Sequence, residues 1–175
     1  MPTPVKGSGP TPMKRKTLIG SIGVAAALIV APFVAGWESG GKPRLVAYQG
    51  KHDPADVWTI CDGETLGVKP GMRETIEGCA ARNEAALIRH AEPVLACTPT
   101  LRGHPNQLSA AISLAYNIGT GGYCQSTVDR RFDAGQWRAA CDAFLMWNKA
   151  GGKVVTGLDR RRRAERDLCL KDLPR

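Results

Sequence analysis

The stretch PNQLSAAISLAYNIG, residues 105–119, decides the fold class of this chain. Its apolar residues recur every three or four positions, which places them on one face of a helix. These residues are Leu108, Ala111, Ile112, Ala115 and Tyr116. Gly119 stands where a glycine in the left-handed conformation commonly ends a helix. The pattern therefore predicts a helix from about Pro105 to residue 118.

Helical patterns also lie on both sides of this segment. From Thr75 onward an apolar stripe predicts a helix that is interrupted near Pro93. After the central helix, apolar residues around positions 137–145 predict another helix, which the glycine pair at 151–152 should stop. A last helix is expected after Gly157, with its arginines facing the solvent. Most of the chain beyond residue 75 is therefore predicted to form a helical lobe.

The segment before this lobe has a different character. Residues 45–65, LVAYQGKHDPADVWTICDGET, contain two β-prone pieces, Leu45 to Tyr48 and Val57 to Cys61, separated by Gly, Asp and Pro turns. This arrangement is typical of a small antiparallel sheet or hairpin. A β patch followed by a helical lobe predicts an α+β domain.

The N-terminal region contains a candidate membrane anchor. Residues 1–16 have no apolar run and end in three basic residues, so we expect a disordered basic N-terminus. Residues 17–37 carry no charge along 21 positions, and as a helix they would extend about 30 Å, enough to cross a bilayer core. Glycines, alanines and Pro32 dilute the strongly apolar residues, so we expect a weak anchor helix over residues 17–36. The basic residues before it should stay in the cytoplasm.

Two features of this region stay open. A cleavable signal peptide is the alternative to an uncleaved anchor. A cut after Ala35 would place Phe33 where a small residue is required, and a cut after Ala27 would fall inside the apolar run. Translation can start at Met1 or at Met13, which directly precedes the basic residues.

Composition and charge limit the classes of protein. The chain has 175 residues, of which 43% are hydrophobic and 23% charged, which excludes a disordered, collagen-like or multi-span membrane protein. It has 24 lysines and arginines against 16 acidic residues, and the net charge of +8 suits a polyanionic partner. Nucleic acid, an anionic membrane surface and a cell-wall polymer are such partners.

The cysteines agree with export. All six lie after the uncharged segment, at Cys61, Cys79, Cys97, Cys124, Cys141 and Cys169. An even number suggests up to three disulfides formed in an oxidising compartment, with about fifteen pairings open. Buried free thiols are the alternative. The absence of C-x-x-C spacing disfavours a zinc site or a redox motif, so no metal is expected.

Carboxylates are the remaining candidates for catalysis, because the sequence lacks the motifs of nucleotide binding, zinc proteolysis and serine hydrolysis. Glu38 is the first charged residue after the uncharged segment. The β patch contributes Thr59 and the acids Asp53, Asp56, Asp62 and Glu64. Two carboxylates across a cleft can cut a glycosidic bond. Acids in turns are usually solvated, so this signal alone is weak.

Three motifs together carry a resemblance to a known family. They are Glu38 with Asp53 and Thr59, AAISLAYNIG at residues 110–119, and RRRRAER at residues 160–166. They resemble the phage-type lysozymes, the endolysin muramidases of glycoside hydrolase family 24. In that family a glutamate at the end of the first helix is followed by an aspartate and, six residues later, by a threonine, as at Asp53 and Thr59 here. The resemblance covers about residues 37–170.

The resemblance implies a fold and a chemistry. We expect a lysozyme-like α+β catalytic domain at residues 37–175, with a small antiparallel β subdomain and a mainly helical lobe, preceded by the anchor helix. It would hydrolyse the β-1,4 bond between N-acetylmuramic acid and N-acetylglucosamine in peptidoglycan, without a cofactor. Glu38 would protonate the leaving oxygen, while Asp53 and Thr59 would activate a water molecule on the opposite face.

Two departures from the family pattern leave alternatives open. The 15 residues from Glu38 to Asp53 are more than the family leads us to expect, so Asp56 is a rival for the role of the aspartate. Glu64 replaces the usual histidine of the family, and a contribution from it as a second acid stays open.

The weak anchor resembles that of the signal-anchor-release endolysins, which are inactive until the anchor leaves the bilayer. While residues 17–36 lie in lipid, Glu38 would be held at the membrane surface and could not face Asp53. We expect a monomer tethered to the host inner membrane, with its N-terminus in the cytoplasm. After release to the periplasm the segment would refold into the helix that carries Glu38 and act on peptidoglycan. The alternatives are an exported wall-binding module without activity and a nucleic-acid-binding protein that uses the arginines at 160–163. We expect no nucleic-acid partner, because the domain is exported.

Overall fold

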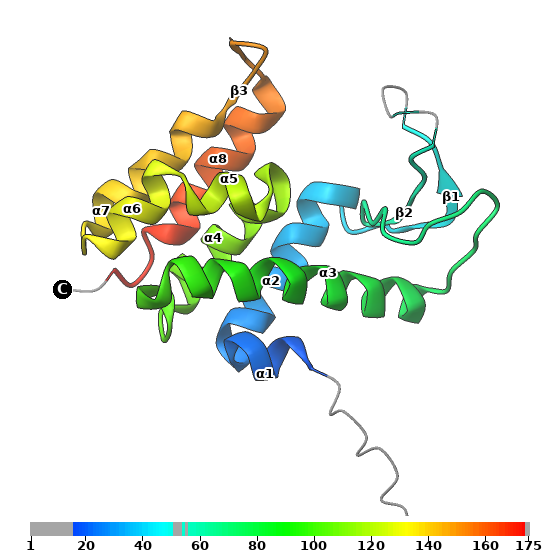
Figure 1. The fold of residues 1–175 in the computed structure, drawn as a ribbon, viewed down its shortest axis with the longest axis horizontal. Helices are drawn as coiled ribbons and strands as arrows, with labels where there is room; N and C mark the ends of the chain where they lie inside the picture. The colour runs from blue at the N-terminus through cyan, green and yellow to red at the C-terminus, as the bar shows by residue number, and fades with distance from the viewer. Residues whose placement is uncertain (1–15, 51–53, 55, 174–175) are drawn as a thin grey trace, which may run out of the picture.

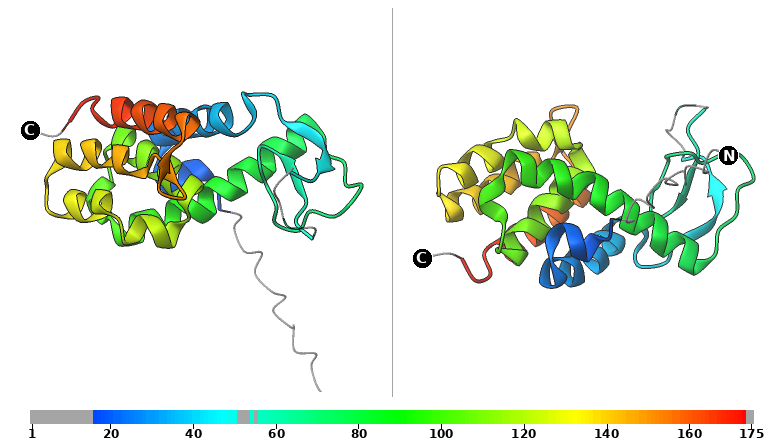
Figure 2. Two further views of the ribbon diagram at one scale, coloured as in Figure 1. Left: turned by 90° about the horizontal axis from the view of Figure 1, so that it is seen from above. Right: turned by 60° about the horizontal axis from the view of Figure 1, so that its bottom comes forward.

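The structure is a computed structural model that describes residues 16–50, 54 and 56–173. A small lobe and a larger helical lobe are joined by the long helix α3 (Ile76–Cys97), as Figures 1 and 2 show. The small lobe contains the antiparallel strands β1 (Arg44–Tyr48) and β2 (Thr59–Cys61), in which Tyr48 pairs with Thr59. The expected α+β organisation is therefore confirmed.

The helical lobe is built around α4 (Pro105–Ile118), whose residues 107–115 are all buried. Around it lie α1 (Leu18–Ile22), α2 (Val24–Ser39), η1 (Pro99–Leu101), α5 (Thr120–Cys124), α6 (Thr127–Asp133), α7 (Trp137–Ala143), η2 (Phe144–Trp147) and α8 (Thr156–Cys169). Strands β3 (Lys149–Ala150) and β4 (Lys153–Val154) form a short hairpin before α8. Helices α2, α3 and α8 all pack against α4.

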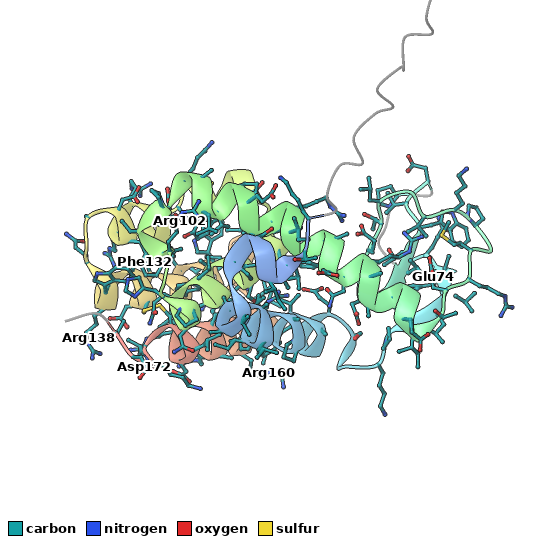
Figure 3. The ribbon with its side chains drawn as sticks, turned by 90° about the horizontal axis from the view of Figure 1, so that it is seen from below. Glu74, Arg102, Phe132, Arg138, Arg160 and Asp172 are labelled. Carbon is teal, nitrogen blue, oxygen red and sulfur yellow. A yellow bond between two sulfur atoms is a disulfide. The ribbon has the colours of Figure 1, made fainter. Side chains whose placement is uncertain are left out.

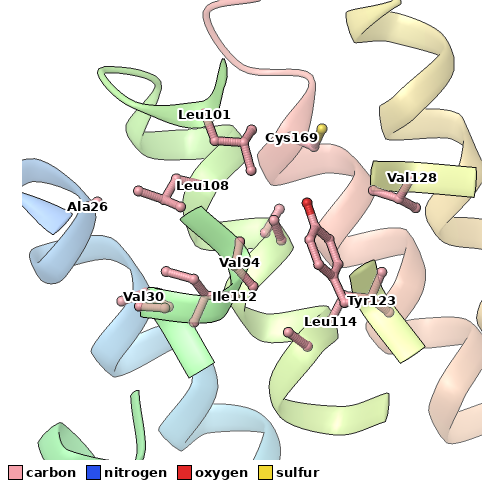
Figure 4. Close-up of a cluster of buried hydrophobic side chains, with 14 of the residues drawn as sticks. Ala26, Val30, Val94, Leu101, Leu108, Ile112, Leu114, Tyr123, Val128 and Cys169 are labelled. Carbon is pink, nitrogen blue, oxygen red and sulfur yellow. The ribbon is translucent and has the colours of Figure 1, made fainter. Parts of the chain in front are cut away.

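The core of this lobe includes side chains from the N-terminal segment. Val30 and Val34 of α2 are fully buried, and Val30 lies beside Ile112 of α4 in Figure 4. Burying a side chain of this size stabilises a fold by about 1.5–3 kcal/mol. Within the described ranges, no helix combines the length and the apolar character that crossing a bilayer requires.

A glycine divides this segment into two helices. Gly23 ends α1 and begins α2 with φ 83° and ψ 161°, a conformation that residues with a Cβ rarely adopt. The chain turns there, so α1 packs against α3 while α2 packs against α4. Residues 17–36 thus do not form one straight helix in this structure.

Two local expectations were wrong. Helix α3 runs through Pro93 instead of stopping there, and the buried side chains of Val94 and Leu95 hold its last turn in the core. Helix α8 does not turn all its arginines outward, because Arg161 and Arg162 are both buried. The predicted helix over residues 105–118 is confirmed, and Gly119 ends it with a positive φ of 83° but an extended ψ of 150°.

The cysteines form three disulfides among neighbouring elements. Cys61–Cys79 joins the end of β2 to the start of α3, Cys97–Cys124 joins α3 to α5, and Cys141–Cys169 joins α7 to α8. The structure supports the expected disulfides. None of the six cysteines, all of which lie in the described part of the chain, is a free thiol. Each bridge closes a loop of 18 to 28 residues, which restricts the unfolded chain.

Candidate functional site

Glu38 lies in the last turn of α2, where the helix meets the small lobe. The helix ends at Gly40, whose left-handed conformation reverses the chain toward β1. The Glu38 side chain is 21% exposed, so its carboxyl group reaches the surface while its stem is packed. A side chain at Gly63, where φ is 92°, would start 3.5 Å from Oε2 of Glu38. That is an ordinary contact distance, so the positive φ, and not a lack of space, favours glycine in this turn beside the carboxylate.

Arg161 of α8 holds the other oxygen of this carboxylate. Its Nη1 donates a 2.6 Å hydrogen bond to Oε1 of Glu38, and its side chain is only 6% exposed. Arg161 is itself fixed from the core, because its Nε donates to Oε1 of Glu165 at 3.2 Å and its Nη2 donates to the carbonyl of Ser113 at 3.2 Å. A bonded and buried guanidinium has little rotamer freedom, so it fixes where the Glu38 carboxylate sits.

The support beneath Arg161 is a buried charge network. Glu165 is fully buried, accepts a 2.6 Å hydrogen bond from Oγ of Ser113 and pairs with Nε of Arg162 at 2.8 Å. Burial raises the pKa of Glu165, and Arg162 is the strongest opposing influence. Glu38 and Glu165 offset the charges of Arg161 and Arg162, as a buried network requires.

The negative charges of three carboxylates act on the phenol of Tyr116, at the end of α4. Burial raises the pKa of Tyr116, and the charges of Glu38, Glu64 and Asp62 raise it further. Asp62 accepts a hydrogen bond from Oγ of Ser39, which ties the turn after β2 to the end of α2. The phenol therefore stays protonated among the acids of the site.

Glu64, the second candidate acid, is bound on both of its oxygens. Its Oε1 accepts hydrogen bonds from the backbone N–H groups of Thr65 at 3.0 Å and Leu66 at 2.8 Å. Its Oε2 pairs with Arg89 of α3. These contacts fix the turn after β2 and connect it to α3, which gives Glu64 a structural part in the hairpin. A catalytic contribution from Glu64 stays a prediction.

The other predicted site residues come from the β patch. Thr59 opens β2, is buried with 7% of its surface exposed, and pairs with Tyr48. Asp53 lies outside the described residues. Asp56, its rival, is exposed in the turn before β2. The structure thus brings Glu38 next to the hairpin that contains Thr59, and the pairing of these residues with Asp53 stays a prediction.

A hollow of about 220 Å³ opens beside Glu38. It is lined by Glu38, Ser39, Lys42, Arg44, Tyr48 and Cys61. Among the described residues, no group of three or more histidine, cysteine, aspartate or glutamate side chains is arranged to hold a metal ion. The chemistry that this arrangement offers is proton donation from a fixed carboxyl group into an open hollow.

Sequence reasoning missed the residues that hold Glu38. The arginines of this helix, Arg161 and Arg162 among them, were expected to face the solvent, and Glu165 was given no role beyond its place in the motif at residues 160–166. The available signal was their spacing, since Glu165 follows the two arginines by four and three positions and so lies on their side of the helix. Ser113 gave no signal, because small polar residues are common in helices.

Comparison with known proteins agrees with this geometry. The family model described as phage lysozyme matches residues 43–165. The chain is 33% identical over 165 residues to the SAR-endolysin of Enterobacteria phage P21, covering 91% of this chain and 96% of that protein. It is 35% identical over 159 residues to the SAR-endolysin of Bacteriophage PS119, covering 86% and 87%.

Comparison with solved structures indicates the same fold as the sequence comparisons. The active form of the P1 phage endolysin Lyz superposes with a TM-score of 0.72 at 25% identity, covering 88% of this chain and 87% of that one. The expected lysozyme-like fold is therefore confirmed.

Proposed function

Because the chain belongs to the phage lysozyme family, we propose that it is an endolysin muramidase that cuts peptidoglycan during host lysis. The bond hydrolysed is the β-1,4 bond between N-acetylmuramic acid and N-acetylglucosamine, and the enzyme works as a monomer. The observation that supports this most directly is the carboxyl group of Glu38, fixed by Arg161 at the edge of an open hollow.

In this mechanism Glu38 is the general acid. It protonates the glycosidic oxygen as the bond to the leaving sugar breaks. Asp53 and Thr59 hold a water molecule on the opposite face of the sugar and activate it for attack, so the anomeric configuration inverts. An inverting pair needs its carboxyl groups roughly 6.5–9.5 Å apart to admit that water.

Substitution of Glu38 tests the assignment. Glu38→Gln keeps the size of the side chain but cannot donate the proton, so clearing of chloroform-treated Gram-negative cells should fall by at least about 100-fold. Glu77→Gln is the matched control, because Glu77 is exposed at the start of α3. Clearing by Glu38→Gln at the rate of the control, at a temperature at which both variants are fully folded, would reject the proposal.

The water-activating residue is tested in the same assay. Asp53→Asn should lose activity, and Asp56→Asn should keep it. The opposite result would transfer the role to Asp56 and leave the acid role of Glu38 in place.

Before lysis the enzyme is tethered to the host inner membrane by residues 17–36, with its N-terminus in the cytoplasm, and it is inactive in that state. The support is that the same residues supply Val30 and Val34 to the core and position Glu38 at the end of α2. They cannot do so while they lie in lipid. Release to the periplasm lets them fold onto α4.

A more apolar anchor should keep the enzyme in the membrane for longer. Gly20→Leu combined with Gly36→Leu raises the apolar content of the segment and leaves the turn at Gly23 unchanged. We expect delayed lysis and an enzyme that stays in the membrane fraction, because leucine favours insertion. The same variant, extracted with detergent, should cut peptidoglycan normally. Lysis at the normal time would contradict the tether.

A further inference from the structure

One side of the hollow beside Glu38 is cationic. Lys42 and Arg44 line it together with Glu38, and both side chains are exposed. The turn at Gly40 and Gly41, with φ values of 64° and 75°, brings the chain from the end of α2 straight into this position. The two residues stand on either side of Pro43 in the sequence, and both line the same hollow. The cations therefore belong to the wall of the hollow that contains the proposed acid.

Arg44 is already oriented. Its guanidinium lies 4.2 Å from the centroid of the Tyr48 ring, and Tyr48 also lines the hollow. Stacking on an aromatic ring holds a guanidinium while leaving its N–H groups free to bind a carboxylate. Less side-chain freedom is then lost when a ligand binds.

Neither cation is neutralised by the part of the chain that the structure describes. No ion pair with a carboxylate is formed there by Lys42 or Arg44. Other arginines near the site differ, since Arg89 pairs with Glu64 and Arg161 pairs with Glu38. Lys42 and Arg44 are therefore available to an anion that enters the hollow.

The glycan strand carries such an anion close to the bond that is cut. N-acetylmuramic acid bears a stem peptide on its lactyl ether, and this peptide contains free carboxylates, whereas the sugars are neutral. The lactyl group sits on a sugar that takes part in the scissile bond. When the scissile bond lies at Glu38, the stem peptide is therefore attached to a sugar that lies at or directly beside the hollow.

We infer that Lys42 and Arg44 form a subsite for the stem-peptide carboxylates of the glycan strand being cut. This inference rests on the proposed muramidase function. It predicts a preference for peptidoglycan whose stem-peptide carboxylates are free over the same material with those carboxylates neutralised, which the function alone does not require. Arg44 binds a carboxylate through its N–H fork, and Lys42 adds a second charge contact.

The test compares two substrates. One is intact peptidoglycan, and the other is the same material whose stem-peptide carboxylates have been converted to neutral amides with a carbodiimide and ammonia. Lys42→Gln combined with Arg44→Gln should lower kcat/KM on intact material about tenfold, because two charge-assisted contacts are lost. On the amidated material the same variant should match the unaltered protein within about twofold, since the carboxylates that those contacts require are absent.

The control removes the same charge elsewhere. Arg138→Gln combined with Lys171→Gln takes two exposed cations from the far end of the helical lobe. Arg138 lies there in Figure 3, opposite the small-lobe end marked by Glu74. This control should lose less than about twofold on intact peptidoglycan and nothing on the neutralised material, because distant charges add only weak, screened attraction to an anionic substrate. A soluble muramoyl tripeptide should inhibit the unaltered protein and the control more strongly than the Lys42 and Arg44 variant.

The outcomes separate this inference from the function on which it rests. An equal loss on both substrates, or no loss on intact peptidoglycan, would overturn the subsite. A tenfold loss shared by the control would also overturn it, because general charge attraction would then be the cause. If the unaltered protein releases no reducing ends from either substrate, the muramidase function itself fails.

Discussion

Glu38 and Arg161 lie 123 residues apart in the sequence, yet they are joined by a 2.6 Å hydrogen bond between Oε1 and Nη1. This contact connects the last turn of α2 to α8. It makes the position of the proposed acid depend on a guanidinium that is bonded to Glu165 and Ser113. The two ends of the chain therefore build the site together.

Removing Arg161 should harm both stability and turnover. Arg161→Gln leaves Glu165 with less compensation and should cost about 3 kcal/mol in the free energy of unfolding. A displaced Glu38 should lower kcat by roughly 100-fold. Arg163→Gln is the control on the same helix, because Arg163 is 65% exposed and pairs with Asp159 at the surface. Urea unfolding and reducing-end release that gave equal values for the two variants would contradict this role.

The turn at Gly23 should be intolerant of a side chain. Gly23→Ala forces alanine to a φ of 83°, which should cost about 1–3 kcal/mol in the folded, released protein. Gly36→Ala lies inside α2 with no atom within 4 Å of its new Cβ, and should be neutral or stabilising by up to about 1 kcal/mol. Thermal unfolding of the two purified variants measures the difference. Equal stability would show that the junction between α1 and α2 can relax.

Two disulfides should differ in their effect on activity. Replacing either pair by alanine should cost about 2–5 kcal/mol. Loss of Cys61–Cys79 should also reduce the rate well below the melting temperature, because Cys61 lines the hollow and has a positive φ of 58°. Loss of Cys141–Cys169, which joins α7 to α8, should reduce the rate less. Rates measured at matched folded fractions give the comparison, and a larger loss from the second pair would contradict it.

Asp129 should make stability depend on pH. Burial raises the pKa of its carboxyl group, Asp133 raises it further, and a hydrogen bond from Thr98 opposes them. A raised pKa in the folded state adds stability below the pKa of the unfolded chain, about 4, and this stability is lost as pH rises through the folded-state value. Asp129→Asn cannot titrate, so relative to the unaltered protein it should gain stability from pH 4 to pH 7. Urea unfolding across that range that showed a constant difference would contradict the prediction.

Local patterns in the sequence were sufficient to predict the central helix and the two strands of the small lobe. The apolar spacing at residues 105–118 predicted α4, and the β-prone pieces at 45–48 and 57–61 predicted the two strands. The buried arginines were not predictable in this way. A run of four arginines is usually solvated. Glu165 at i+4 is a local signal for Arg161, but the contact with Glu38, 123 residues away, is visible only in three dimensions.

The division of the N-terminal segment into two helices could not be predicted from the sequence either. Residues around Gly23 are compatible with one continuous helix in lipid, and glycine permits that conformation as well as the turn seen here. Packing of α1 on α3 and of α2 on α4 selects the turn. An uncharged apolar pattern does not by itself reveal whether such a segment stays straight or turns at a glycine.

The burial of Val30 and Val34 bears on how this protein can be produced and engineered. A recombinant form that starts at residue 37, where the charge pattern predicts the start of the catalytic domain, would lack α1 and most of α2 and would expose the apolar face of α4. Such a truncation should aggregate instead of yielding a shorter antibacterial enzyme. A foreign leader for secretion would have to be placed ahead of residue 17, so that cleavage leaves both helices on the product.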